Sequence, residues 1–305
     1  MRDLSYSAIV TSYNSSDSIL KAIRSILKQS VSPSEILIVD DCSSDDSIVI
    51  IKSEFQSSAN LNIFSTELNS GPAFARNVGV SKAKSANIIF FDDDDISHPH
   101  RAKVHLNALK QSDVSYVSSQ KDYQNGYFVK NRSDEFHGLV NPNSFAEYLI
   151  SGIGMENALN LYVPAAVMAI RKDAFVKAGG FDSNLRRLED VDIAIRLSII
   201  QMRFEFSELT LVDRKYSKGS DKSTAIEARS QLYLLTKHKN LLSDRNFRFA
   251  KDWAALRASY FSRRWLGLLF FTIKIISTYG PKSFRIKTGF KRIMHDINIL
   301  KSKRG

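Results

Sequence analysis

Four consecutive aspartates, Asp92 to Asp95, follow directly after the apolar run Ile88 to Phe91. Adjacent carboxylates repel one another, and a bound cation would relieve that repulsion. Hard divalent cations prefer oxygen ligands, and Mg²⁺ typically takes one or two protein carboxylates together with water and substrate phosphates. A solvated acidic turn would have the same composition, but the position directly after an apolar strand favours a ligand site. The run therefore indicates a Mg²⁺ or Mn²⁺ site that meets a diphosphate.

Polar residues also follow two earlier apolar runs. Thr11 to Asn14 come after the first run, and Asp40-Asp41 end the second. In open parallel sheets, ligands bind beyond the carboxyl ends of the strands, so these groups could share one crevice with the aspartates. No G-x-G-x-x-G or G-x-x-x-x-G-K follows any of these runs, so a bound nucleotide would not rest its phosphates on a glycine loop.

Alternating strand and helix patterns would position these groups. The predicted strands are Tyr6–Thr11, Glu35–Asp40, Leu61–Phe64, Asn87–Phe91, Asp113–Ser119 and Leu161–Ile170, and the predicted helices are Ser18–Gln29, Asp45–Glu54, Phe74–Lys82, His98–Gln111 and Leu188–Ile200. This rhythm predicts an α/β fold with a mostly parallel sheet flanked by helices. Residues Lys121–Asn160 read as loops with a short helix, and the pattern after Lys222 is helical almost to the end.

Length and composition fit this class. A chain of 305 residues suits one large α/β domain with an appendage or two small domains. Its single cysteine, Cys42, allows no internal disulfide, which is typical of the reducing cytosol. The polar start does not resemble a signal peptide, and no run reaches the roughly 18 apolar residues that a membrane span needs. We therefore expect a cytoplasmic protein.

The charge is unevenly distributed. Residues Arg245 to Gly305 hold 15 Lys and Arg and two Asp, whereas the whole chain has a net charge of +11, so the rest of the chain is slightly acidic. Apolar and aromatic residues alternate with basic ones over Phe249–Ile276 and Phe284–Leu300. Helices with one apolar and one basic face lie in the membrane interface. This change predicts a catalytic domain over residues 1–222 and a basic helical region over residues 223–305. The basic region could anchor the protein to an anionic membrane surface; the alternative is that it packs on protein. Nucleic acid is not expected as a partner.

Five segments in order resemble the family 2 glycosyltransferases of bacterial cell-surface polysaccharide synthesis, which have the GT-A fold. The segments are Ile9–Asn14, Ile38–Asp45, Gly71–Asn77, Phe90–Asp95, and Gly179–Asp182 with Glu189-Asp190. The resemblance covers roughly residues 5 to 220 and implies an inverting transfer of one sugar, of the hexosyl or N-acetylhexosaminyl type. The donor would be a nucleotide sugar, most often a UDP-sugar, and the acceptor a growing, lipid-linked glycan.

The resemblance also implies roles for individual residues. Thr11 and Tyr13 would line the base pocket, and Asp41 would bind the uracil edge. Arg76 would meet the nucleotide or its phosphates. Asp94 would be the firmest metal ligand, with Asp92 and Asp93 for the ribose of the nucleotide or for the metal.

The Glu189-Asp190 pair has two readings. Acids at the start of a helix favour the helix dipole, which needs no catalytic role. In the resembled family the aspartate of this pair is the general base that takes the proton of the attacking acceptor hydroxyl. On that reading the base is Asp190.

Departures and alternatives remain at this level. Arg214-Lys215-Tyr216 stands where family members often carry Arg-x-His, so a metal or phosphate contact there is in doubt. A nucleotidyltransferase would usually show a glycine-rich phosphate loop after the first strand, which Thr11–Asp17 lacks. A receiver module is much shorter and has its acid pair after the first strand. An inactive nucleotide-binding protein on the same fold also stays open.

Overall fold

The structure is a computed structural model that describes residues 5–56, 58–123, 127–130, 138–151, 163–215 and 224–280. Contacts divide the chain into two compact units. The first comprises Met1–Asn143 and Leu161–Gly219, and the second comprises Ser144–Asn160 and Ser220–Gly305. The boundary predicted from sequence lay between 222 and 223, and the structure groups residues 144–160 with the C-terminal helices as well.

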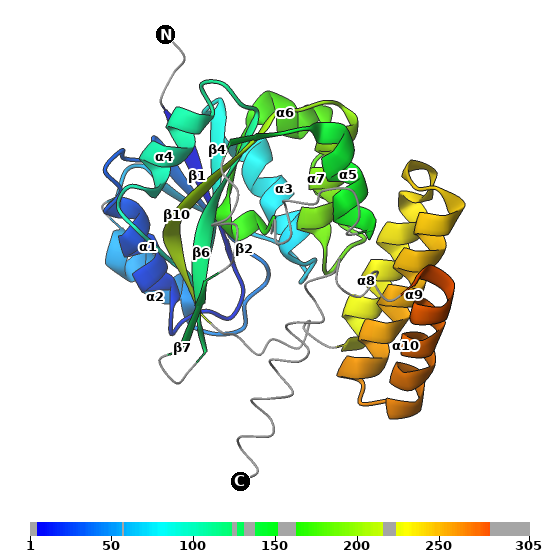
Figure 1. Ribbon diagram of the computed structural model, residues 1–305. Coiled ribbons are helices and arrows are strands. Elements are labelled where there is room, and N and C mark those ends of the chain that lie inside the picture. The colour runs from blue at the N-terminus through cyan, green and yellow to red at the C-terminus, as the bar shows by residue number, and fades with distance from the viewer. Residues whose placement is uncertain are drawn as a thin grey trace. The chain divides into compact units, whose positions relative to one another are not determined.

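One sheet organises the first unit (Figure 1). Its strands are β1 (Tyr6–Ser12), β2 (Glu35–Asp40), β3 (Leu61–Ser65), β4 (Asn87–Asp92), β5 (Ile96–Ser97), β6 (Val114–Tyr123), β7 (Tyr127–Lys130), β8 (Gly138–Val140), β9 (Met168–Arg171) and β10 (Phe204–Lys215). The order is β3-β2-β1-β4-β9-β6-β10-β5, with β7 beside β6 and β8 beside β10. The four strands from β3 to β4 are parallel, as is β6 with β10. β9 runs antiparallel to both β4 and β6, so the sheet is mixed beyond β4.

Helices lie on both faces of this sheet. They are α1 (Ile19–Leu27), α2 (Ser47–Phe55), α3 (Pro72–Lys82), α4 (Arg101–Ala108), α6 (Lys172–Lys177) and α7 (Glu189–Ile199), with a 3₁₀ turn η2 (Ala165–Val167) before β9. Ile19 and Ile23 of α1 join one buried cluster with Val10 of β1 and Ile38 of β2, and α2 and α4 contribute to the same cluster. Side chains three or four residues apart share one face of a helix, and alternate side chains of a strand point to one face of the sheet. The apolar residues of both kinds of element therefore meet in this cluster.

The opposite face carries α3 and α6. Gly79 of α3 lies so close to Ile9 of β1 that a Cβ atom there would stand 2.5 Å from the Ile9 Cγ2. Phe175 of α6 packs against Phe90 of β4, with ring centroids 6.0 Å apart. Because both faces are covered, every residue of β2 is buried, as expected for a central strand of a parallel sheet.

The second unit is helical. It contains most of α5 (Pro142–Ser151), then α8 (Thr224–Lys237), a 3₁₀ turn η4 (Lys239–Leu241), α9 (Asp244–Phe261) and α10 (Trp265–Tyr279). Phe249, Trp253 and Leu256 of α9 form a buried cluster with Ile275 of α10. Within the described ranges, no helix combines the length and the apolar composition that crossing a bilayer requires.

The α/β fold class with a helical C-terminal extension is confirmed, and β1 to β4 and β6 match their predictions within a few residues. The predicted strand Leu161–Ile170 is instead η2 followed by β9, and β6 runs on into the segment predicted as loops. β5, β7, β8, α6 and β10 were not predicted from the sequence. The second basic stretch, Phe284–Leu300, lies outside the described residues.

Candidate active site

The acidic run forms the turn between β4 and β5. Asp92 is the last residue of β4, and carboxylate oxygens of Asp92, Asp94 and Asp95 lie within 4.8 Å of one another. A donor set made only of carboxylate oxygens on one turn fits a hard divalent cation such as Mg²⁺ or Mn²⁺. The predicted metal ligands Asp94 and Asp92 are therefore brought together, and Asp95 joins them, which the sequence reading did not anticipate.

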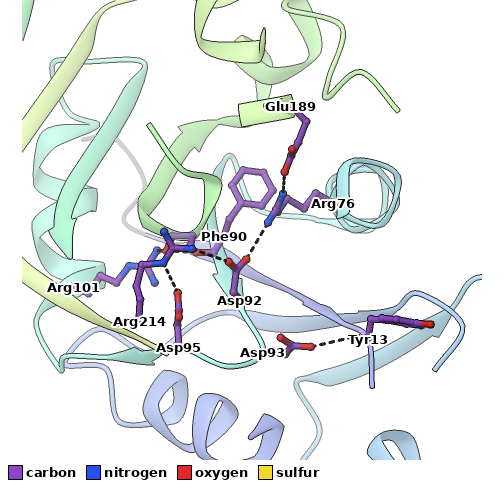
Figure 2. Close-up of polar contacts among 10 residues, drawn as sticks. Tyr13, Arg76, Phe90, Asp92, Asp93, Asp95, Arg101, Glu189 and Arg214 are labelled. Atoms are coloured by element: carbon purple, nitrogen blue, oxygen red, sulfur yellow. Dashed lines mark hydrogen bonds and ion pairs between the residues drawn. The ribbon is translucent and has the colours of Figure 1, made fainter. Parts of the chain in front are cut away.

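Two arginines compensate the charge of this turn (Figure 2). Arg76 of α3 donates from Nη2 to Asp92 at 3.0 Å, and Arg214 of β10 donates from Nε to Asp95 at 3.2 Å while its Nη2 stands 3.7 Å from Asp92. Burial acts to raise the pKa of Asp92, but the charges of Arg76 and Arg214 outweigh it and hold that pKa below the ordinary value. Asp92 is thus an anion before any metal arrives, which is the state a metal ligand needs.

The pKa values of Asp93 and Asp95 are shifted in the opposite direction to that of Asp92. Burial raises the pKa of each to about 7. Asp93 accepts a hydrogen bond of 2.9 Å from the backbone N–H of Tyr13, and Asp95 accepts one of 3.3 Å from the backbone N–H of Lys215. The turn is therefore fastened to the loop after β1 on one side and to β10 on the other.

The loops after β1 and β2 lie at the same edge of the sheet. Thr11 pairs with Asp92 across the β1–β4 ladder and is partly buried, whereas Tyr13 is 47% exposed. The Asn14 side-chain oxygen accepts from the backbone N–H of Ser44 at 2.8 Å, which joins the two loops. An exposed aromatic ring at this edge is available to stack on a planar ligand.

Asp41 is buried, and its carboxylate orders the segment that leads into α3. One oxygen accepts from the backbone N–H of Ser70 at 2.9 Å and the other from that of Gly71 at 2.7 Å. Gly71 has a φ of 89°, in the left-handed region that favours glycine. The oxygen bound by Ser70 also accepts from the Thr66 hydroxyl at 3.1 Å, so the oxygen bound by Gly71 is the one with capacity for a further hydrogen bond to a ligand.

Arg76 connects the acidic turn to α7. Its Nη1 donates to Glu189 at 2.8 Å while Nη2 holds Asp92, and all three side chains are largely buried. Arg76 thus forms a buried ionic bridge between Asp92 and Glu189, which are far apart in the sequence. The predicted contact of Arg76 with a phosphate stays a prediction. The bridge brings the start of α7, where Asp190 lies, to the acidic turn.

Asp190 is partly buried at the N-terminus of α7, with one oxygen accepting from the backbone N–H of Val191 at 2.8 Å. Burial raises the pKa of Asp190 to about 7, and the neighbouring charge of Glu189 acts in the same direction. A carboxylate with a pKa near the working pH is suited to accept a proton and to release it.

The Gly179–Asp182 motif has a structural role. The backbone N–H and C=O of Phe181 bond the side-chain amide of Asn77 at 2.8 Å each, and Gly179 and Gly180 both have positive φ. Arg196 of α7 donates to the carbonyl of Gly180 at 2.6 Å. The Gly179–Asp182 segment therefore fixes α7 against α3.

Arg101 was also missed. It is fully buried at the start of α4 and donates to the carbonyls of Phe90 at 2.7 Å and Ala166 at 2.8 Å. Burial lowers the pKa of Arg101 to about 10. In the sequence Arg101 stands between His100 and Ala102 in the predicted helix His98–Gln111, and nothing in that pattern marks it as buried. Tyr216, where the family often has histidine, lies outside the described residues.

The acidic turn and the polar loops lie at the carboxyl edge of the parallel strands, which is where α/β proteins bind their ligands. Comparison with known proteins is more specific: the family described as "Glycosyl transferase family 2" matches residues 7–176, more than half of the chain. The chain belongs to this family. The matched segment includes the acidic turn and ends before α7.

Relatives agree with this assignment. An uncharacterized glycosyltransferase of Haemophilus influenzae is 29% identical over 192 residues, 63% of this chain and 61% of the relative. The amylovoran biosynthesis glycosyltransferase AmsB of Erwinia amylovora is 26% identical over 212 residues, 67% of each chain. The crystal structure of Staphylococcus aureus TarS 1–349 in complex with UDP-GlcNAc superposes with a TM-score of 0.63 at 22% identity, covering 85% of this chain and 74% of that chain. This likeness shows the GT-A fold. The chain spans less than two thirds of the length of the Haemophilus relative.

Proposed function

We propose that this protein is an inverting, metal-dependent glycosyltransferase. It moves one hexosyl or N-acetylhexosaminyl group from a nucleotide sugar, a UDP-sugar, to a hydroxyl of a growing lipid-linked surface glycan. The observation that carries the proposal is the cluster of Asp92, Asp94 and Asp95 at the carboxyl edge of the sheet, joined by Arg76 to the start of α7. The alternative of a nucleotidyltransferase is disfavoured because the chain belongs to a glycosyltransferase family.

Residues of this chain divide the work. Tyr13 and Thr11 bind the base, and Asp41 lies at the polar edge of the base. Asp93 supports the nucleotide through the loop that contains Tyr13, because its carboxylate accepts from the backbone N–H of Tyr13. Asp94 and Asp92 would hold Mg²⁺ or Mn²⁺, which neutralises the developing charge of the leaving diphosphate when bound. Arg76 keeps Asp92 ionised and ties it to α7.

Asp190 is the proposed base. The acceptor hydroxyl attacks the anomeric carbon, its proton passes to the Asp190 carboxylate, and the bond from the anomeric carbon to the diphosphate oxygen breaks. One displacement inverts the configuration and needs no sugar–enzyme intermediate. The raised pKa of Asp190 supports this role, because a carboxylate with a pKa of about 7 is a stronger base than an ordinary carboxylate. It can therefore accept the proton of the acceptor hydroxyl as that oxygen attacks.

Similar proteins support the proposed donor and setting. Poly(ribitol-phosphate) beta-N-acetylglucosaminyltransferase TarS is 35% identical over 95 residues, 30% of this chain and 16% of TarS, and its structure was solved with UDP-GlcNAc. AmsB acts in amylovoran biosynthesis, as its name states. These likenesses support a UDP-sugar donor and a polysaccharide product, and we infer a cytoplasmic protein at the inner face of the membrane.

A donor screen tests the proposal. Purified protein with Mn²⁺ or Mg²⁺ is incubated with a panel of nucleotide sugars, with lipid-linked glycan acceptors and without them, and nucleoside diphosphate release is measured. We expect release from one UDP-sugar that rises when an acceptor is added. Release of pyrophosphate from a nucleoside triphosphate and a sugar phosphate would instead identify a nucleotidyltransferase.

A further inference from the structure

The outer face of α10 is apolar and exposed. Six large hydrophobic side chains on this helix have exposed fractions between 42% and 86%; they are Trp265, Leu266, Leu269, Phe270, Ile273 and Ile276. Their spacing of three and four residues places them on one side of the helix. These six residues are called the outer face below.

The inner face of α10 is apolar as well. Leu268, Phe271, Ile275 and Tyr279 pack against the buried residues of α9. The single charged residue of the helix, Lys274, forms an ion pair of 2.7 Å with Asp252 of α9. The structure thus corrects the expectation of a basic face opposite the apolar one on this helix. A helix that is hydrophobic all round is normally buried, so we expect a partner to cover the outer face.

The charges around α10 indicate the chemistry of the partner that covers this face. Arg263 and Arg264 are exposed directly before the helix, and Arg245, Arg248 and Lys251 are exposed on α9. Residues 281–305, which follow the helix in the sequence, contain eight Lys and Arg and one Asp. A suitable partner therefore combines an apolar interior with negative charge at its surface. A second copy of this chain would bring the same excess of positive charge and be repelled.

We propose that the outer face of α10 inserts into the interface of a bilayer that contains anionic lipids. Trp265 suits this depth, since Trp rings gather at the boundary between headgroups and acyl chains. Phe and Leu, as at Phe270 and Leu266, are typical of the apolar face of an interfacial helix. The helix has 15 residues and a length of about 22 Å at roughly 1.5 Å per residue, shorter than a hydrocarbon core of about 30 Å. It therefore lies along the surface, with basic residues near the headgroups.

This attachment goes beyond the proposed transfer and does not depend on it. If the acceptor is lipid-linked, as proposed above, the attachment would keep the enzyme on the surface where the acceptor is found.

Vesicle sedimentation with the full chain tests the attachment. The vesicles are phosphatidylcholine alone or with about one third phosphatidylglycerol, a fraction that gives a negative surface. We expect binding to the anionic vesicles at low ionic strength and much weaker binding to the neutral ones. The double variant Leu266→Ser/Phe270→Ser changes only exposed positions, and we expect its partition to fall by about tenfold or more.

Leu232→Ser is the matched control, because Leu232 is an exposed leucine of α8 in the same unit. Its partition should stay within about twofold of the parent protein. Arg263→Gln/Arg264→Gln should weaken binding to anionic vesicles only. Circular dichroism melting checks that each variant is folded.

Two results would overturn the proposal. One is a full-length protein that ignores anionic vesicles at low salt, and the other is an α10 double variant that binds them as well as the parent does. If the parent protein is a dimer that the α10 substitutions dissociate, and neither binds vesicles, the cover is a second copy. The assay contains no nucleotide sugar, so its outcome is separate from that of the donor screen.

Discussion

Asp190→Asn is expected to make the protein more stable while it disables transfer. The substitution keeps the shape of the side chain and the acceptor for the Val191 N–H, but removes the charge. Burial raises the pKa of Asp190 from 3.8 to about 7, which corresponds to an upper limit of about 4 kcal/mol against the ionised form. Glu189 and Arg76 share in this interaction and the site is partly solvated, so we expect a gain of about 1–2 kcal/mol in the free energy of unfolding.

The sign of the effect depends on pH. A carboxyl group whose pKa is raised in the folded state contributes stability that is fully present below about pH 4, and this contribution is lost as the pH rises through about 7. The advantage of Asp190→Asn over the parent should therefore be largest near pH 8, shrink by more than half at about pH 5 and vanish near pH 4.

The same substitution separates binding from chemistry. Donor binding should survive, and transfer should fall by roughly 10²-fold or more, because the positioned base is gone. For the parent enzyme, kcat/KM should fall on the acid side with an apparent pKa of about 7.

Urea unfolding at three pH values, calorimetric titration with UDP and a transfer assay measure these effects. Asp46→Asn, at an exposed position before α2, is the matched control and should change stability by less than about 0.5 kcal/mol. A variant that transfers sugar at a near-normal rate would refute Asp190 as the base, and Glu189 would be tested next. A variant that is less stable than the parent at pH 8 would refute the electrostatic reasoning.

Two further substitutions test the packing that positions the site. Arg76→Gln should cost about 3 kcal/mol or more in thermal or urea unfolding, because it removes the cation paired with the largely buried Glu189 and the nearer of the two cations beside Asp92. Arg24→Gln, which breaks an exposed ion pair, should cost less than about 1 kcal/mol, and equal costs for the two would contradict the burial argument. Gly79→Ala should lower stability by about 1–3 kcal/mol, since the new methyl group would overlap Ile9, and an unchanged melting temperature would show that α3 can shift away from the sheet.

The strands that carry the acids could be read from the sequence because their signals are local. Apolar runs at 88–91 and 36–39 with polar residues after them define β4 and β2 and the edge at which their ends meet. β10 was missed because its alternation breaks between Ser207 and Val212, where the pairing with β6 shifts register.

The ionic framework of the site could not be read in this way. Arg214 and Asp95 are 119 residues apart, and Arg76 and Glu189 are 113 residues apart. No periodic pattern links such pairs, because sheet order and strand direction decide which of them meet. Asp95 had no predicted role, and its burial, its ion pair with Arg214 and its hydrogen bond from the Lys215 N–H are visible only in the folded structure.

The central claim is that the acidic turn after β4 holds a divalent cation that binds the donor's diphosphate. Calorimetric titration of UDP into the protein, with Mn²⁺ and with excess EDTA, tests it most directly, and Asp94→Asn is measured beside the parent and beside Asp46→Asn. We expect UDP affinity to fall by about tenfold or more in EDTA, and we expect Asp94→Asn to bind UDP weakly whether or not Mn²⁺ is present. UDP binding that is equally tight with Mn²⁺ and with EDTA, or a parent-like Mn²⁺ dependence in Asp94→Asn, would contradict the claim.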